Sequence, residues 1–564
     1  MGPAGHCRST AGLLPQSWQN VSWRRRRPSS REPGSSWRRH LGAALGEQAY
    51  AAKYAGEHVS EWTRQLSVLC EIGRSYPNAA HSAYTKGFAS KVNYFLRTIE
   101  GMERYLGPLD EMLQEGLAPV LLSEGRAVDD DLLRASELPN RLGGLGLRRF
   151  ADQSDGPSLA QEQYRASKHV TRPLVELIEA QQVELKAYPA EKIRKLKNEV
   201  AARRDKERVR RYTRFMASGA PESMRRAVEK AAAIGASAWL ASLPIKEWGM
   251  CLSQEQWADV IALRFGQPLR NLPVLCGCGT AFSIPHGLEC KTGGFINARH
   301  NDLRDFFISF AQAVFSLVRR EPKLRSLSED EMKDYAAKYK TPNLKENPRG
   351  DFSIVGLFRE FERCFMDVRV WNHLACSYLD KTVEELHDTH EQEKNRVYKD
   401  RIVNYENGSF LAVVFNTAGS ASPGAELLMK RLALQAEAVG FMEFGAAMAF
   451  MRTRVSMILA KAASECIRGT HVPKDKTEMR RAKDFARRRG CAELQPMMQR
   501  RDKGAFEDFL RLTRVPHSEP RPAEFEQCPC PPALSADCEP CSGPLPHEQG
   551  PLGRHHNSLM RRDA

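Results

Sequence analysis

Three cysteines and a histidine lie within fifteen residues near the middle of the chain, in the order Cys276, Cys278, His286 and Cys290. Thiolates and an imidazole in this C-x-C-x7-H-x3-C pattern are ligands that suit tetrahedral Zn²⁺. The glycines on either side of Cys278 allow the tight turn that such close spacing of two ligands requires. Because four protein ligands close the coordination sphere, the pattern predicts a structural zinc ion that replaces a small core. Incidental buried cysteines beside a polar histidine are the alternative.

The size and charge of the chain restrict its class. Its 564 residues allow several domains, and its net charge of +15 favours a nucleic acid over an anionic membrane as partner. Fourteen cysteines in a long chain whose N-terminus lacks an apolar signal segment argue against a disulfide-stabilised secreted protein. The apolar stretch at 439–460 is interrupted by Glu443, Arg452 and Arg454, so it predicts buried helices. We therefore expect no membrane partner.

Composition changes along the chain predict a mainly helical α+β protein with disordered ends. Residues 1–40 carry eight arginines against one acid, which predicts a disordered arm that contacts phosphates, acts as a nuclear address or has no role. The last fifty residues contain ten prolines, and this crowding argues against a second metal site at Cys528, Cys530, Cys538 and Cys541. The predicted order is a basic arm (1–40), a helical region (41–235), a helical linker with the cysteine knuckle (236–295), an α/β core (296–420), C-terminal helices (421–490) and a disordered Pro-rich tail (515–564).

A long charged helix is predicted at 185–215. Between Glu191 and Arg211 there are ten basic and four acidic residues. A solvated helix stabilised by pairs four residues apart is one interpretation, and contact with nucleic-acid phosphates is the other. The candidate contacts in the second interpretation are Arg203, Arg204, Arg210 and Arg211.

Short runs rich in Val and Phe predict strands in the α/β core. They are "DFSIVGLF", "CFMDVRVW" and "FLAVVFNT". An amphipathic helix that ends at Glu321-Pro322 is expected before them, and a helix at 387–406 separates the second strand from the third. The predicted order is helix–strand–strand–helix–strand, with room for one further short strand.

Two acids of these strands are candidates for a Mg²⁺ site. Asp351 begins the first strand, and Asp367 lies in the second with Arg369 on the same face. Two converging carboxylates suit a hard cation that assists attack on a phosphodiester. Lys394 and Tyr398 share one face of the following helix. Ordinary strand-end acids and a solvated lysine are the alternative.

Six features in one order, from Cys276 to Tyr398, resemble the restriction-like PD-(D/E)xK endonuclease domain of site-specific non-LTR retrotransposons. The features are the CCHC knuckle, "RHN" at 299–301, "EP" at 321–322, the two acids, and "EKNRVY" with Lys394 and Tyr398. Upstream, "HSAYTKGFASKVNYFLRTIE" and "LPNRLGGLGLRR" resemble the thumb and connector that follow the polymerase palm of retroelement reverse transcriptases. The likeness covers about 41–470, as in the C-terminal part of such a polyprotein.

The resemblance implies roles for individual residues. It makes Asp351 and Asp367 ligands of a catalytic Mg²⁺, with Glu321 as an additional ligand. Lys394 and Tyr398 correspond to the lysine and tyrosine of the family. Arg369 stands where many such nucleases have lysine; because arginine does not release its proton, it would clamp phosphate.

The same resemblance assigns contacts outside the acid pair. His300 would steady the knuckle or contact DNA, and Arg299 of the same triplet would bind nucleic acid. Gly350 departs mildly from the family pattern, which often has proline there. The paired aspartates of a palm are missing, since "VDDDLL" at 128–133 lies at a polar helix start. We therefore do not expect reverse transcription by this chain.

The favoured hypothesis is a Mg²⁺-dependent DNA endonuclease that nicks DNA for a retroelement, with a structural Zn²⁺ in the knuckle. DNA and retroelement RNA are the expected partners, in the nucleus or in a cytoplasmic ribonucleoprotein. One alternative is an inactive DNA- or RNA-binding remnant of a retroelement. Another is a helical interaction protein whose knuckle only builds shape.

Overall fold

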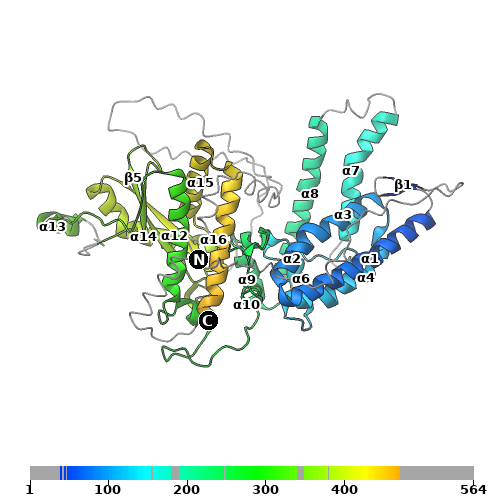
Figure 1. Cartoon of the computed structure of the whole chain (residues 1–564), viewed down its shortest axis with the longest axis horizontal. Coiled ribbons are helices and arrows are strands. Elements are labelled where there is room, and N and C mark those ends of the chain that lie inside the picture. Colours follow the sequence, from blue (N-terminus) through cyan, green and yellow to red (C-terminus); the bar gives the residue numbers. More distant parts are fainter. Residues whose placement is uncertain are drawn as a thin grey trace, which may run out of the picture. The chain divides into compact units, whose positions relative to one another are not determined.

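The computed structural model describes residues 38–40, 43–45, 48–153, 157–179, 190–246, 249–338, 348–378 and 380–469 (Figure 1). Within these ranges the protein is mainly helical, with one four-stranded sheet and one two-stranded sheet, so the α+β class is confirmed. The Pro-rich tail with its four cysteines and the basic arm up to residue 37 lie outside them. The last residues of the predicted arm form strand β1 (Arg38–His40), which pairs antiparallel with β2 (Ala43–Leu45).

The predicted helical region starts with α1 (Gln48–Ser75), which buries Trp62 and Leu66 from one of its faces. These side chains pack with those of the short helices that follow, and together they form one hydrophobic core. These are α2 (Pro77–Ala83), a π-helical turn (Tyr84–Phe88), α3 (Ala89–Thr98), a 3₁₀ turn (Met102–Tyr105), α4 (Gly107–Glu111), a second π-helical turn (Met112–Leu117), α5 (Ala118–Leu122), α6 (Asp130–Glu137) and a 3₁₀ turn (Asn140–Leu142).

Two sequence features of this region have the local structure predicted for them. The "VDDDLL" segment is a helix start, because Asp129 caps α6 by accepting the backbone N–H of Leu132 at 2.7 Å. The glycine-rich turn after residue 138 depends on the missing side chain of Gly144: a Cβ there would lie 1.9 Å from the carbonyl oxygen of Leu138.

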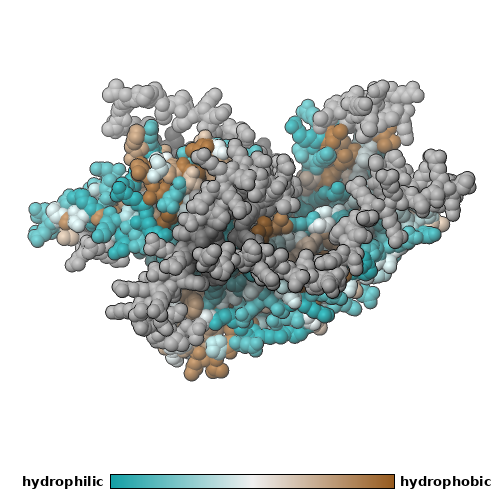
Figure 2. Space-filling view, in the orientation of Figure 1, coloured by the Kyte–Doolittle hydropathy of each residue, from teal (hydrophilic) through white to brown (hydrophobic). Residues whose placement is uncertain are grey.

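The predicted charged helix is α8 (Ala190–Met216), which packs beside α7 (Leu159–Glu179). In the upper parts of these helices, Figure 2 shows hydrophilic residues on the outer side of α8 and apolar residues toward α7. The elements that lead to the knuckle are α9 (Glu222–Ala232), a 3₁₀ turn (Ala238–Ala241) and α10 (Gln254–Arg264).

The four-stranded sheet has the order β3-β4-β5-β6. The first three strands are antiparallel neighbours, and β6 runs parallel to β5. A parallel pair needs a crossover, which is supplied by α14 (Val383–Tyr405). The strands are β3 (Val318–Arg320), β4 (Phe352–Val355), β5 (Arg363–Trp371) and β6 (Ser409–Asn416). The remaining elements are α11 (Ile284–Glu289), α12 (Phe295–Val314), α13 (Glu329–Lys338), a 3₁₀ turn (Cys376–Tyr378), α15 (Pro423–Ala438) and α16 (Phe444–Arg468).

The three predicted strands are confirmed as β4, β5 and β6, whereas the predicted end of the preceding helix is wrong. Helix α12 ends at Val314, and residues 318–320 form β3. The reason is a tertiary contact. Val318 lies opposite Ile354, and the backbone groups of residues 318–320 hydrogen-bond to β4 instead of continuing the helix. The room left for one further short strand is thus filled by β3.

Side chains of β5 alternate between the two faces of the sheet. Met366 and Val368 belong to the main core with residues of α12, α15 and α16, whereas Trp371 packs against α14. Phe365 likewise lies in a small cluster with Ile402 of α14. The odd-numbered positions of β5, which include Asp367 and Arg369, therefore face α14.

Candidate functional site

The predicted knuckle is a tight turn followed by a short helix. The backbone N–H of Cys276 donates to Thr280 at 2.8 Å, and Gly279 closes the turn with a left-handed φ of +87°. His286 lies in α11, and Cys290 caps the end of that helix. Of Gly277 and Gly279, the two glycines beside Cys278, only Gly279 has a positive φ.

The geometry of the four ligand atoms fits a tetrahedral metal ion. All four lie within 4.8 Å of one another. Cys276 Sγ is 3.6 Å from Cys290 Sγ, and Cys278 Sγ is 3.3 Å from His286 Nε2. Two thiolates on one zinc ion stand about 3.8 Å apart. Hydrogen bonding with Thr280 lowers the pKa of the exposed Cys278 thiol to about 6, which favours the thiolate that a metal requires. The predicted cluster can therefore hold a metal ion, consistent with structural zinc.

The knuckle packs onto the α/β core. Leu288 of α11 is fully buried with Cys466 and Ile467 of α16. Arg299, which is 3% exposed, donates from Nη1 to the Leu288 carbonyl at 3.3 Å. A contact of Arg299 with nucleic acid is therefore not supported, because its buried guanidinium joins α11 to α12.

The structure brings together Asp351, just before β4, and Asp367 of β5. The backbone N–H of Asp351 donates to Met366 at 2.9 Å, which aligns the two strands beside the acids. Burial raises the pKa of Asp367 above its ordinary value; the Lys394 ammonium opposes this, and the Asp351 charge adds to it. The acids therefore interact electrostatically, as two ligands of one cation would.

Lys394 and Tyr398 of α14 complete this group, which we call the acid site. Lys394 Nζ is 2.5 Å from Asp367 Oδ2, and the ammonium lies 5.8 Å from the centre of the Tyr398 ring. Tyr398 stacks on Phe410 of β6, and burial raises the pKa of its hydroxyl well above the ordinary value. The phenol therefore stays protonated and can donate a hydrogen bond.

Arg369 lies on the same face but already has a partner. Its Nη1 donates to Glu393 Oε2 at 2.7 Å, and His390 Nδ1 lies 3.6 Å from the same oxygen. Glu393 directly precedes Lys394 and was not predicted as a site residue. Its place in "EKNRVY" is the signal that could have suggested it.

Glu321 follows β3 instead of ending a helix, and its carboxylate is held by arginines. Arg304 Nη1 lies 2.8 Å from Glu321 Oε1, and Arg349 Nη1 lies 3.3 Å from Oε2. Its backbone N–H does donate to the Asp351 carbonyl at 2.8 Å. Both ion pairs of the Glu321 side chain are thus with arginines, and the structure does not join Glu321 to the acid pair as the predicted additional metal ligand.

His300 lies against the acid site. Its Nε2 is 3.0 Å from Asp351 Oδ1. The sequence predicted a contact with the knuckle or with DNA, and the partnership with Asp351 was missed. Because His300 precedes Asp351 by 51 residues, nothing local in the sequence signals this contact.

The four candidate arginines of α8 divide into two pairs. Arg204 donates to Gln163 at 2.8 Å and Arg211 bonds Glu162 at 2.9 Å, so both hold α7. A direct phosphate contact by these two is not supported. Arg203 and Arg210 are exposed, and Arg210 pairs with Glu207 at 3.4 Å.

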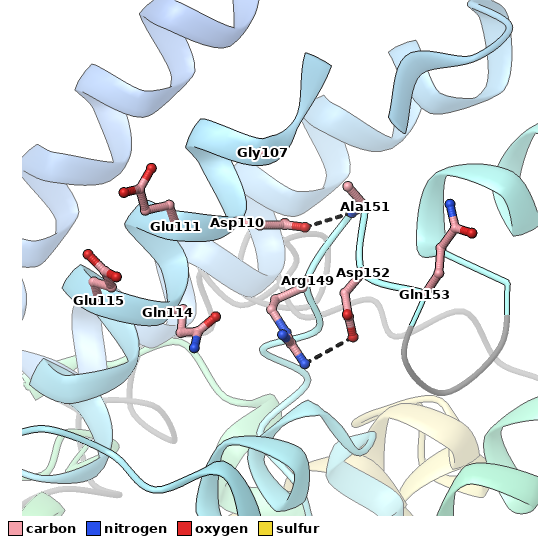
Figure 3. Close-up of a pocket in the computed structure, with 9 residues that line it drawn as sticks. All are labelled: Gly107, Asp110, Glu111, Gln114, Glu115, Arg149, Ala151, Asp152 and Gln153. Carbon is pink, nitrogen blue, oxygen red and sulfur yellow. Dashed lines mark hydrogen bonds and ion pairs between the residues drawn. The ribbon is translucent and has the colours of Figure 1, made fainter. Parts of the chain in front are cut away.

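A pocket of about 530 Å³ lies in the helical region, away from both predicted sites (Figure 3). Three of its polar groups have structural partners: Asp110 accepts the backbone N–H groups of Phe150 and Ala151 at 2.6 and 2.7 Å, and Arg149 pairs with Asp152 at 2.9 Å. The pocket is lined by Gly107, Asp110, Glu111, Gln114, Glu115, Arg149, Ala151, Asp152 and Gln153. Its acidic lining does not suit a polyanion.

Comparison with protein-family models and with curated proteins found no match to this chain. No helix in the described ranges is long and apolar enough to cross a membrane.

Proposed function

We propose that the protein is a metal-dependent DNA endonuclease whose acid site performs the cut. The observation that carries this proposal is the meeting of Asp351, Asp367 and Lys394 from three separate elements. The sheet supports it as well. Its order agrees with the helix–strand–strand–helix–strand order predicted for this core, with β3 as the one further strand.

The acid site has the donor set for Mg²⁺. Asp367 is 6% exposed and lies near a second carboxylate, so a divalent cation would offset their repulsion. Asp351 and Asp367 would hold the ion. When bound, Mg²⁺ would polarise a phosphate oxygen and lower the pKa of a bound water.

The other residues have roles that follow from their charge. Lys394 would neutralise Asp367 before metal binds, and its ammonium would then stabilise negative charge on the phosphate. The Tyr398 ring lies beside that ammonium, and its hydroxyl, which stays protonated, would donate a hydrogen bond. Arg369 is bound to Glu393, so contact with phosphate would require that pair to open.

The surroundings of the acid site have less specific roles in this proposal. The helical region before residue 235 would correspond to the thumb and connector of a retroelement reverse transcriptase. The exposed cations of α8, with Arg203 among them, would bind DNA or retroelement RNA through phosphates. An enzyme with this activity would act on DNA in the nucleus or belong to a cytoplasmic ribonucleoprotein.

Nicking of supercoiled plasmid tests the proposal. The wild-type chain should convert supercoiled DNA to nicked circles with Mg²⁺ and not with EDTA. Asp351→Asn and Asp367→Asn should each lower the rate by about 100-fold or more, since each removes a charge that holds the metal. Asp388→Asn, an exposed acid on α14, is the matched control and should retain the wild-type rate.

DNA affinity must be measured for the same proteins. Unchanged affinity with lost nicking separates cutting from binding. A wild-type protein that binds DNA and does not nick it would overturn the nuclease and leave the alternative, an inactive binding remnant. The closed ion pairs Lys394–Asp367 and Arg369–Glu393 are the observation that favours this alternative.

A further inference from the structure

The Asp351 side chain is held at both carboxylate oxygens. His300 Nε2 lies 3.0 Å from Oδ1, and the backbone N–H of Val368 donates to Oδ2 at 2.6 Å. An ionised carboxylate only accepts hydrogen bonds, so the imidazole must donate from Nε2. Each oxygen retains a lone pair, so these bonds orient the group without filling it.

His300 is tied to the knuckle through its neighbour in the sequence. Arg299 donates to the carbonyl of Leu288, which lies between the ligands His286 and Cys290. Two glycines with φ of +85° and +79°, Gly293 and Gly294, make the turn from the knuckle into α12. The path from Cys290 to His300 is therefore ten residues long and fixed at both ends.

The knuckle also contacts the strand that carries Asp367. Asn372, which directly follows β5, donates from Nδ2 to the Pro285 carbonyl at 3.0 Å. Pro285 precedes the ligand His286. One small metal-binding segment thus contacts the supports of both acids, α12 for Asp351 and β5 for Asp367.

We propose that His300 is a positioning residue for Asp351 and that the metal ion of the knuckle fixes this contact. This inference rests on the proposed function, because it treats Asp351 as a ligand of the catalytic cation. Loss of a group that hydrogen-bonds a metal ligand commonly lowers metal affinity by about 10- to 100-fold. At the acid site His300 is such a group, and the knuckle fixes its position.

Direct binding of Mn²⁺, measured by electron paramagnetic resonance on the purified full chain, tests the inference without relying on activity. His300→Ala should weaken Mn²⁺ binding by about 10- to 100-fold. His300→Gln should restore most of it, since the glutamine amide can donate to the same oxygen. Asn297→Ala, an exposed change one turn earlier on α12, should leave binding unchanged. Zinc content and melting temperature confirm that each variant is folded.

The knuckle is tested by Cys278→Ser, which changes an exposed ligand. This variant should lose zinc and weaken Mn²⁺ binding as His300→Ala does, and the double variant should be no weaker than either single one. In nicking assays, His300→Ala should lower kcat at saturating DNA and leave KM for DNA unchanged.

The outcomes separate the inference from the proposed function. A wild type that nicks, with a His300→Ala variant of equal Mn²⁺ affinity, overturns the inference alone. Equal loss in His300→Ala and His300→Gln also overturns it, because a merely structural role predicts that result. A wild type that binds Mn²⁺ without nicking, with the expected variant pattern, supports positioning and refutes cutting. A wild type that binds no Mn²⁺ refutes both.

Discussion

The knuckle and the acid site are both clusters of potential metal ligands, and they differ in how they are assembled. The knuckle takes four ligands from fifteen consecutive residues, whereas the acid site joins residues from Asp351 to Tyr398, with His300 added from α12. The knuckle ligands chiefly contact one another, whereas Asp367 pairs with Lys394, and Asp351 bonds His300 and the backbone N–H of Val368. The knuckle should therefore depend on its metal for structure, and the acid site should be held by the fold.

Loss of a knuckle ligand should have the largest effect on stability. Structural zinc can contribute about 10 kcal/mol of apparent free energy in small sites, because binding and folding are coupled. Cys290→Ser should abolish zinc binding and lower the melting temperature, since Leu288 then loses its fixed place on α16. Atomic absorption and calorimetry measure the two effects.

Cys376→Ser is the control for this prediction, because Cys376 is exposed and lies outside the cluster. If the wild-type protein contains no zinc and melts at the same temperature as Cys290→Ser, the knuckle does not depend on a metal for its structure. That result would contradict the account of the knuckle given above.

At the acid site, Lys394→Ala should be the most destabilising single change. It leaves the Asp367 carboxylate buried without its ion-pair partner, which typically costs about 3–5 kcal/mol. Lys399→Ala changes an exposed lysine of the same helix and should cost little. Urea unfolding gives both values. Adding Asp367→Asn to Lys394→Ala should recover part of the loss; no recovery would mean that the ion pair is not the cause.

The helix that carries Lys394 should also lose stability in acid. Burial lowers the pKa of His387 to about 4 from 6.5, and its Nδ1 accepts the Trp371 Nε1–H at 3.2 Å. Because the pKa is lower in the folded state, this contribution is fully present above about pH 6.5 and is lost as pH falls through 4. A shift of this size corresponds to about 3 kcal/mol.

His387→Gln isolates this contribution, because glutamine keeps an acceptor for Trp371 and does not titrate. The difference in unfolding free energy between wild type and variant should narrow by a few kcal/mol, on the order of that shift, as pH falls from 7 to 4. A difference that stays constant over this range would show that His387 does not titrate on unfolding.

The smallest effects concern α8, where neighbouring arginines should behave differently. Arg203→Ala should leave the free energy of unfolding unchanged. It should make the plot of log DNA affinity against log salt concentration less steep by about 0.9, the contribution of one phosphate contact. Arg204→Ala should cost about 1 kcal/mol, because it breaks the bond to Gln163. Identical effects of the two changes on DNA binding would contradict the division of the helix into packing and exposed cations.

The sequence was a better guide to the knuckle than to the acid site for a physical reason. Close spacing of four soft ligands limits their geometry, so the cluster could be predicted before any fold. The strands around Asp351 and Asp367 were also predictable, because alternation places one face of β5 toward α14. Arg369 points to that face as expected. Its partner Glu393 lies on α14, so the alternation along β5 could not predict the pair.

The predicted end of the helix before the strands is wrong because tertiary contacts outweigh local pattern there. The stretch from 315 to 321 continues an amphipathic helix by composition, but β4 offers hydrogen bonds that make β3. The buried contact of Arg299 with Leu288 and the contact of His300 with Asp351 depend on how α12 packs. Spacing along the chain cannot specify such long-range pairs.

The most direct test of the acid site as a cutting centre is the rate of Mg²⁺-dependent plasmid nicking by wild type and Asp367→Asn at equal DNA occupancy. We predict nicking by the wild type, its loss with EDTA, and a fall of about 100-fold or more in the variant. Equal rates for the two proteins, or no nicking by a folded, zinc-loaded wild type, would contradict the account.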